Sequence, residues 1–235
     1  SSDVCSSDLA RAAGVQFRHN IAVRGIEIER GQVRRLVIDD EAGMDESLRA
    51  DAYVVALASY SPLLLEPVGI SIPVYPVKGY SMTLPLRPDD LAPQVSLSDD
   101  SHKLVFSRLG ERLRVAGTAE LNGYDTSLNN ARCEALLRRT RELFPSMFED
   151  GRENASKTET KENGSRGGER LVEYWTGLRP ATPSNLPYIG RTKYPNLYLN
   201  TGHGTLGWTR ACGSGSALAE IVSGRNPELG FNFWL

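Results

Sequence analysis

A run of six residues without a charged or amide side chain, Tyr53 to Ala58 (YVVALA), constrains the fold more than any other segment. A strand that shows no alternation of polar and apolar residues is typical of a strand buried on both faces, as in a parallel sheet. The polar turn at Ser59 ends the run, and Ser61 is a candidate cap for a short helix that holds Leu63 to Leu65. The run therefore predicts a mixed α/β chain that contains part of a parallel sheet.

Most other segments indicate antiparallel structure. Residues 22–29 and 33–39 alternate on either side of Arg30-Gly31, which predicts a β-hairpin. Residues 127–145 place their apolar side chains on one helical face, and Pro145 ends that helix. Further strands are expected at residues 14–20, 72–86, 103–120, 172–178 and 196–200.

The composition narrows the classes of function. The 235 residues are 40% hydrophobic and 24% charged, with a net charge of -2, so no electrostatic argument favours nucleic acid. No apolar run approaches the roughly 18 residues that a transmembrane helix needs. Three scattered cysteines give neither a disulfide framework nor a metal site, so we expect no metal and a reducing, cytoplasmic compartment.

Two segments fall outside these patterns. Residues 1–9 (SSDVCSSDL) show neither strand nor helix periodicity, and we interpret them as a tag or artefact. Residues 149–170 contain almost no apolar side chain, which predicts a polar surface loop without a function of its own.

The segment from Asn196 to Gly224 carries the chemistry. Its strand NLYLN runs into the turn TGHGTLGWT and then into a helix that Gly224 ends. A glycine-rich turn at a helix N-terminus presents backbone N–H groups to an anion or a polar ring edge. The same turn also occurs simply to let a helix pack, and its spacing is neither a P-loop nor the dinucleotide motif GxGxxG.

Four separated runs carry a resemblance to a known family: WTGLRPATP, LPYIGRTKYPNLYLNTGHGTLGWTRACGSG, PVYPVKGYSMTLPL and DAYVVALASYS. They resemble the D-amino-acid dehydrogenase small subunits of the glycine oxidase/D-amino-acid oxidase flavoproteins. In that family an N-terminal Rossmann unit with GxGxxG holds part of FAD. The motif is absent here and the resemblance starts after it, so we expect the C-terminal portion of such a protein.

The resemblance implies a division of the chain. The fold would be α/β with α+β character, combining part of a Rossmann-type FAD-binding domain with an antiparallel-sheet substrate domain. Residues 10–71 and 172–235 would belong to the FAD-binding domain, and residues 72–171 to the substrate domain.

The resemblance also implies individual roles. Arg179 in GLRP matches the arginine that binds the substrate carboxylate, for which a two-pronged guanidinium is suited. Val23 matches a position whose backbone contacts the adenine, and Ala58 and Ser59 match a second cofactor-contacting turn. The loop under the flavin corresponds to Gly202, His203, Gly204, Thr205, Leu206, Gly207, Trp208 and Thr209.

Several of these residues have a second interpretation. Arg179 could be an ordinary surface arginine, and Tyr80 is as consistent with a strand aromatic as with a catalytic residue lining the substrate pocket. We interpret His203 as a turn residue and not as a base, and Lys78 as a solvated strand residue. Trp175 and Trp208 are interpreted as packing residues, and Cys212 as a small buried residue.

The activity that the resemblance implies is FAD-dependent oxidative deamination of a D-amino acid to a 2-oxo acid and ammonia. Electrons would pass to a quinone-type acceptor of the respiratory chain, which would place the whole enzyme at the periphery of the bacterial inner membrane. Two alternatives stay open: an amine oxidase of the glycine or sarcosine type, and an inactive fragment without the Rossmann unit.

Overall fold

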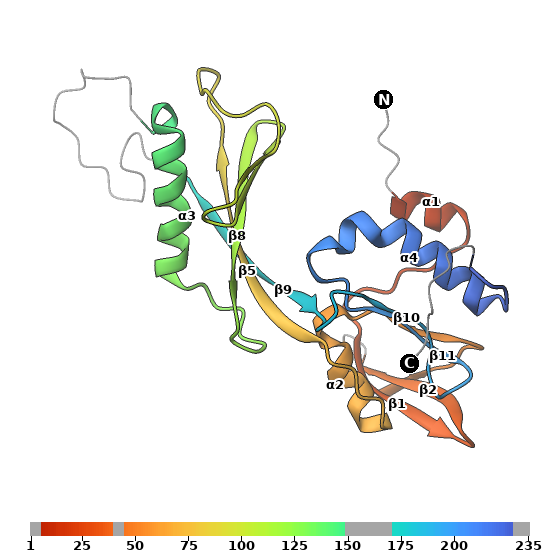
Figure 1. Ribbon diagram of the computed structural model, residues 1–235. Helices are drawn as coiled ribbons and strands as arrows, with labels where there is room; N and C mark the ends of the chain where they lie inside the picture. The colour runs from red at the N-terminus through yellow and green to blue at the C-terminus, as the bar shows by residue number, and fades with distance from the viewer. Residues whose placement is uncertain (1–5, 40–44, 149–170, 228–235) are drawn as a thin grey trace. The chain divides into compact units, whose positions relative to one another are not determined.

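The computed structural model describes residues 6–39, 45–148 and 171–227 (Figure 1). They form two compact units: unit 1 comprises Ser1–Val74 and Thr182–Leu235, and unit 2 comprises Tyr75–Ala181. Both combine helices with sheets, so the expected mixed class is confirmed. Residues 172–181, which the sequence analysis grouped with the C-terminal segment, lie in unit 2. The roles of the units remain predictions.

Unit 1 contains an antiparallel sheet in the order β1-β2-β3, made of β1 (Ala22–Glu29), β2 (Gln32–Asp39) and β3 (Asp45–Leu48). Arg30 and Gly31 both have positive φ, 52° and 76°, as in a two-residue type I′ hairpin turn. The hairpin predicted from residues 22–39 is therefore confirmed.

The N-terminal region differs from expectation. Helix α1 (Ser6–Ala12) forms although its sequence shows no periodicity, and residues 15–19 form no strand. Phe17 in that stretch is 42% exposed and stacks on His19. A strand needs a hydrogen-bonded partner, and residues 15–19 pair with none of the described strands, so alternation alone did not decide the structure.

The apolar run forms β4 (Tyr53–Val55), which pairs in parallel with β11 (Leu197–Thr201). Strand β11 also pairs antiparallel with β10 (Tyr188–Arg191), giving the order β10-β11-β4. The parallel pairing was predicted correctly. Burial on both faces was not: Tyr53 and Val55 are buried, but Val54 is 47% exposed, because the described residues cover one face of β4.

Short helical segments follow β4: η1 (Ala58–Tyr60), α2 (Ser61–Leu65) and η2 (Glu66–Val68). Ser61 does not cap α2, since the cap residue is Tyr60 and makes no side-chain bond. The last helix, α4 (Gly207–Val222), follows the turn η4 (Gly204–Leu206) and packs Leu218 and Ile221 against Tyr198 of β11. A larger core lies under β4 and β11, with Leu65, Leu197 and Leu199 fully buried.

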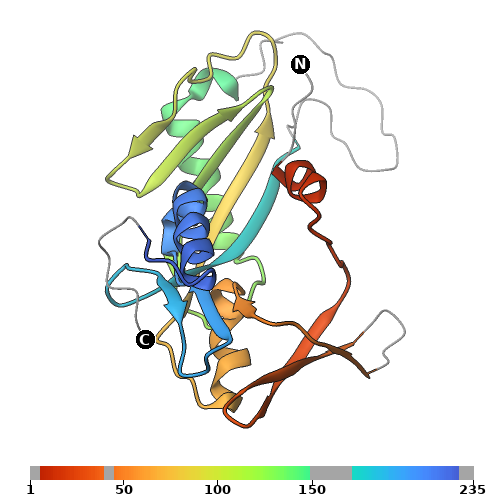
Figure 2. The same cartoon turned by 90° about the vertical axis from the view of Figure 1, so that its right-hand side faces the viewer.

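Unit 2 is an antiparallel sheet covered on one face by a helix (Figure 2). In sheet order its strands are β6 (Leu97–Asp99), β7 (Leu104–Leu109), β8 (Arg112–Glu120), β5 (Tyr75–Pro85) and β9 (Glu173–Ala181). Helix α3 (Asn130–Leu143) begins after Asn129, whose side chain accepts a hydrogen bond from the Ala131 amide, and η3 (Pro145–Met147) follows it. The predicted helix is confirmed with shorter bounds.

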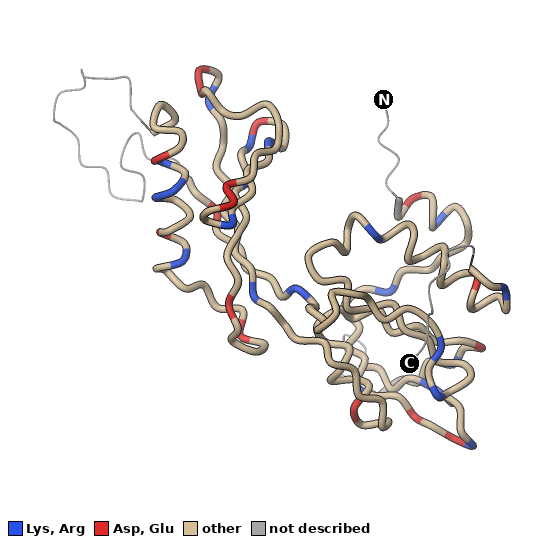
Figure 3. The backbone as a smooth tube through the Cα atoms, in the orientation of Figure 1, with Lys and Arg blue, Asp and Glu red and all other residues tan. Residues whose placement is uncertain are grey.

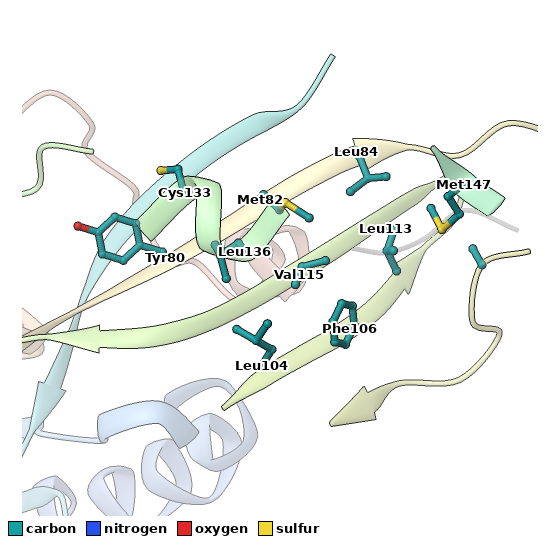
Figure 4. Packing of buried hydrophobic residues seen from close by; sticks show 11 residues of the cluster. Tyr80, Met82, Leu84, Leu104, Phe106, Leu113, Val115, Cys133, Leu136 and Met147 are labelled. Atoms are coloured by element: carbon teal, nitrogen blue, oxygen red, sulfur yellow. The ribbon is translucent and has the colours of Figure 1, made fainter. Parts of the chain in front are cut away.

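The core of unit 2 lies between α3 and the sheet (Figure 4). Alternate residues of β5, namely Tyr80, Met82 and Leu84, point to this core with Cys133 and Leu136 of α3. The residues between them therefore face the opposite side of the sheet, which we call the open face.

Acidic and basic residues are interspersed along the described backbone of both units (Figure 3). None of the helices in the described ranges is long and apolar enough to cross a membrane.

Candidate functional site

In unit 1 the carboxyl ends of the parallel strands β4 and β11 meet. Ligands of α/β proteins bind outside the carboxyl ends of parallel strands. Thr201, the last residue of β11, donates a hydrogen bond from Oγ1 to the Ala58 carbonyl at 3.0 Å, and its Oγ1 lies 2.8 Å from Ser61 Oγ. These bonds join the predicted Ala58–Ser59 turn to the glycine-rich turn that starts at Gly202.

The backbone at this junction is conformationally unusual. Gly202 has φ 79°, and a Cβ there would lie 2.8 Å from Thr182 Cγ2, so only glycine fits. Ala58 also has positive φ, 49°, which costs a non-glycine residue about 1–2 kcal/mol. Strain of this kind concentrates at ligand-contacting turns.

The turn exposes part of its backbone hydrogen-bonding capacity. The Leu206 amide donates to the His203 carbonyl at 3.2 Å and is thus engaged within the turn. Within the described ranges, the amides of Gly204 and Thr205 make no such bond. Helix α4 begins at Gly207 without a side-chain cap, so its first turn offers N–H groups and the positive end of the helix dipole to a ligand.

His203 anchors the turn to α4. Its Nε2 lies 3.0 Å from Ser214 Oγ, and Ser214 is buried. Burial lowers the pKa of His203, and the charge of Arg210 lowers it further. The imidazole is therefore neutral near pH 7 and holds the turn, consistent with a turn residue.

The other predicted cofactor residues do not contribute hydrogen bonds or packing to this junction in the described part of the chain. Trp208 is 95% exposed, so it is not a packing residue within unit 1, and Thr209 beside it is exposed. Cys212, expected to be buried, is exposed. Val23 lies in β1, in the other sheet of the unit, and no described hydrogen bond joins it to the turn.

The residues at this junction suit a flavin ring. Asn200, next to Thr201, has a buried Oδ1 with no hydrogen-bond partner among the described residues. A buried polar atom without a partner is costly unless a ligand or water satisfies it. Together with the uncapped helix and the unengaged turn amides, Asn200 provides polar groups for the edge of a flat heteroaromatic ring.

In unit 2 the predicted substrate residue Arg179 lies half-buried on the open face of β9. Its Nη1 donates to the Thr118 carbonyl at 2.8 Å. Thr118 has φ 56° and lies in a β-bulge of β8, where one extra residue disturbs the pairing with β5 between Lys78 and Tyr80. Burial lowers the pKa of Arg179, yet no carboxylate pairs with it among the described residues.

A glycine lets the guanidinium lie flat on the sheet. A Cβ at Gly79 would come within 2.5 Å of Arg179 Cζ and Nη2. Gly79 and the bulge at Thr118 therefore position Arg179, although neither was predicted from the sequence. An arginine held in this way, with donors still unpaired, is suited to bind a carboxylate through two parallel hydrogen bonds.

Tyr80 lies on the opposite face of β5. It is 2% exposed, packs in the core beside Cys133 (Figure 4), and donates its hydroxyl to Glu120. Burial and this hydrogen bond raise the pKa of Tyr80. This geometry supports the interpretation of Tyr80 as a core aromatic, and it provides no support for contact with a substrate.

Lys78 was expected to be solvated, but it is 1% exposed. Its Nζ lies 3.5 Å from Glu120 Oε2 and 3.6 Å from Asp125 Oδ2, and 5.5 Å from the centre of the Tyr80 ring. Burial alone would lower the pKa of Lys78, but the hydrogen bond to Tyr80 and the two carboxylates raise it. Lys78 is the only charged residue of β5, and this single charge was the sequence signal for the buried ion pair.

Among the described residues no cluster of three or more His, Cys, Asp or Glu side chains could hold a metal ion. The described groups that the two sites offer to a ligand are backbone amides, a neutral imidazole and a guanidinium.

Comparison with known families decides the assignment. Residues 7–221 match the DAO family model, described as FAD dependent oxidoreductase. The chain belongs to this family of FAD dependent oxidoreductases. FAD is the cofactor of the family.

Two curated relatives of the FAD dependent oxidoreductase family illustrate the similarity. A D-amino acid dehydrogenase from Dechloromonas aromatica is 55% identical over 95% of this chain and 49% of its own length. A D-amino acid dehydrogenase from Methylobacterium nodulans is 45% identical over 92% of this chain and 46% of its own length. The chain thus spans about half the length of the relatives it matches.

Solved structures of other proteins share the fold of this chain. A glycine oxidase from Geobacillus kaustophilus superimposes with a TM-score of 0.74 at 23% identity, covering 96% of this chain and 54% of that one. An L-proline dehydrogenase from P. horikoshii gives 0.73 at 16% identity, covering 94% and 54%.

Proposed function

We propose that this chain is the portion of an FAD-dependent D-amino acid dehydrogenase that binds the substrate carboxylate and one edge of the flavin. The protein would convert a D-amino acid to a 2-oxo acid and ammonia and pass the electrons to a quinone-type acceptor. The observation that carries the proposal is Arg179, a half-buried guanidinium fixed by the Thr118 carbonyl and by Gly79. The names of the relatives at 55% and 45% identity support the substrate class.

In this proposal Arg179 orients the amino acid. Two parallel N–H···O bonds fix both oxygens of the carboxylate, and so restrict the rotation of the Cα that carries the reacting hydrogen. FAD, when bound, supplies the acceptor for the hydride that leaves Cα. The amino group must be deprotonated before the hydride can leave. Among the residues that the structure describes, His203 is not suited to act as the base, because its pKa is lowered and its Nε2 contacts Ser214.

The turn from Gly202 would serve the cofactor. Negative charge that develops on a reduced flavin is favoured near the N-terminus of α4 by the helix dipole. The amides of Gly204 and Thr205 and the side chain of Asn200 would hydrogen-bond the polar edge of the ring. Ala58 and Ser59, fixed by Thr201, would form the facing turn.

The test completes the protein with the part of the Dechloromonas aromatica relative that this chain does not match. The purified protein is examined for flavin absorbance between about 350 and 500 nm and for bleaching by D-amino acids without oxygen. We expect bound flavin, bleaching by D-alanine, and release of a 2-oxo acid and ammonia. Bleaching by glycine or sarcosine but not by D-alanine would replace the proposal with a glycine-oxidase-type activity.

The chain without that added part is the matched comparison. If it binds no flavin while the completed protein does, the cofactor site requires both parts. If neither protein binds flavin, the assignment of the Gly202 turn is wrong. Reduction of a soluble quinone by the bleached protein tests the electron acceptor separately.

A further inference from the structure

Trp175 is an exposed aromatic residue that does not belong to the hydrophobic core of unit 2. It lies on β9, is 60% exposed, and faces away from the core that Tyr174 contacts. The interpretation of Trp175 as a packing residue is therefore wrong. Residues 175, 177 and 179 alternate along the strand, so Trp175 shares the open face with Arg179.

The indole is directed toward Arg179 along the strand. A Cβ at Gly177 would come within 2.2 Å of the Trp175 ring atom Cη2, so the ring lies over Gly177. The Arg179 guanidinium lies over Gly79, and Gly79 and Gly177 are directly paired across β5 and β9. Paired positions are about 4.5–5.5 Å apart, so the ring and the guanidinium cover neighbouring positions.

Because the two paired glycines have no side chains, the guanidinium and the indole can lie next to each other against the sheet. Ser81, the residue opposite Trp175, is buried, and it accepts a hydrogen bond from Arg114 Nη2 at 3.4 Å. The Arg114 guanidinium also lies 5.8 Å from the centre of the Trp175 ring. These contacts hold the indole in place beside the carboxylate-binding position.

We propose that Trp175 determines specificity by forming the wall against which the side chain of the substrate lies. The inference rests on the proposed function, because it takes the ligand of Arg179 to be the α-carboxylate of a D-amino acid. The side chain on Cα then extends from the guanidinium over the neighbouring indole. A flat apolar surface selects D-amino acids with unbranched apolar side chains over those with anionic ones.

The expected gain follows from burial of apolar surface. A buried methylene contributes about 0.8 kcal/mol, equivalent to a roughly fourfold rise in kcat/KM. The series D-alanine, D-2-aminobutyrate, D-norvaline and D-norleucine adds one methylene at each step. We expect kcat/KM of the completed, FAD-loaded protein to rise along this series and to be low for D-glutamate.

Two substitutions at Trp175 test the wall. For Trp175→Ala we expect the ratio of kcat/KM between D-norleucine and D-alanine to fall toward one, and for Trp175→Phe an intermediate ratio. Val105→Ala is the matched control, because Val105 is 44% exposed on the same face of the sheet but lies on β7, away from Arg179. Unchanged melting temperatures would show that the variants fold.

Calorimetric titration with acetate, butyrate and hexanoate gives a readout that needs no turnover. The dissociation constant should fall with chain length in the unsubstituted protein and in Val105→Ala, but not in Trp175→Ala. If Trp175→Ala keeps the same dependence on chain length in both assays, the wall lies elsewhere and the inference is overturned. It is also overturned if D-glutamate is the preferred substrate and Arg114→Ala removes that preference.

The two proposals can fail separately. A protein that oxidises no amino acid but binds longer carboxylates more tightly through Trp175 would refute the proposed function and retain the wall. A protein that oxidises D-amino acids without regard to Trp175 would retain the function and refute the wall.

Discussion

Arg179 combines two properties that rarely occur together on a protein surface. It is partly buried, which lowers the pKa of the guanidinium, and among the described residues its one hydrogen bond goes to a neutral carbonyl. An arginine keeps its charge even so, because its ordinary pKa lies far above neutral pH. A positive charge removed from water without an anionic partner attracts an anionic ligand strongly. Substitutions at Arg179 and at the residues that position it should therefore change carboxylate affinity measurably.

The first prediction concerns Arg179→Lys. Lysine retains the charge but cannot make two parallel bonds, and a hydrogen bond to a charged group contributes about 1.5–3 kcal/mol. We expect the affinity of the completed protein for acetate to fall roughly 10- to 100-fold. Equal affinity in calorimetry would show that the charge alone binds the carboxylate.

The second prediction concerns Gly79→Ala. The added Cβ would lie 2.5 Å from Arg179 Cζ, so the flexible arginine side chain must move away from the surface of the sheet. Carboxylate affinity should fall while the melting temperature changes little. Gly25→Ala is the control, since Gly25 is also a strand glycine and a Cβ there would meet nothing within 4 Å. A loss of affinity in the control as large as in Gly79→Ala would contradict the role of Gly79.

The sequence indicated candidate residues at these positions but not their geometry. The run GLRP made Arg179 a candidate, and Lys78, the only charged residue of β5, could have indicated the buried ion pair. The opposition of Gly79 and Gly177 and the bulge at Thr118 depend on strand register, which separated segments of sequence do not determine. The same parity places Tyr80 in the core and Trp175 on the open face.

At the scale of elements, α4 and the turn before it are held together by a side-chain contact. His203 joins the turn to Ser214 of α4, and because the pKa of His203 is lowered, the stability that this contact provides depends on pH. Between its lowered folded pKa and the ordinary value of 6.5, the unfolded chain binds the proton more readily. The contribution of His203 to stability is therefore full above pH 6.5 and is lost as the pH falls through that window.

The third prediction follows from that sign. Urea unfolding of the protein at pH 8 and at about pH 5 should show a loss of stability on acidification that is smaller in His203→Gln. Glutamine can still hydrogen-bond Ser214 but does not titrate. His19→Gln is the control, because it removes an exposed imidazole from the same unit. Equal pH dependence in all three proteins would contradict a buried neutral His203.

Helix α3 provides the fourth prediction. Leu136 is 1% exposed in the core between α3 and the sheet, whereas Leu143 at the end of the helix is 40% exposed. Leu136→Ala should lower the free energy of unfolding by about 2–5 kcal/mol, through lost burial and the cavity left behind. Leu143→Ala should change it by less than about 1 kcal/mol. Similar losses in urea unfolding would contradict this packing.

Elements were easier to predict from the sequence than their limits. The hairpin of residues 22–39 and helix α3 were predicted because alternation and helical periodicity are local signals. Strand β4 was predicted as parallel, but the exposure of Val54 depends on which residues cover the sheet. Residues 14–20 show the alternation typical of a strand, but residues 15–19 pair with no described strand and so form none.

At the scale of the molecule, unit 2 is one continuous segment, Tyr75–Ala181, with a core of its own. The fifth prediction is that this segment, expressed alone, unfolds cooperatively in urea when followed by near-ultraviolet circular dichroism. The same segment with Leu136→Ala should unfold at a lower urea concentration. A gradual change without a transition would show that unit 2 depends on the remainder of the chain.

The ends of unit 2 are neighbours: Tyr75, the first residue of β5, pairs directly with Ala181, the last residue of β9. Once that pair has formed, the two stretches of chain that build unit 1 are connected as if by a tight turn. The entropy of loop closure grows by about 0.6 kcal/mol for each doubling of the loop, so early folding of unit 2 lowers the cost of joining β4 to β11. In the folded protein the insertion of unit 2 therefore keeps the ends of the two flanking segments close together, which favours the pairing of the parallel strands on either side of it.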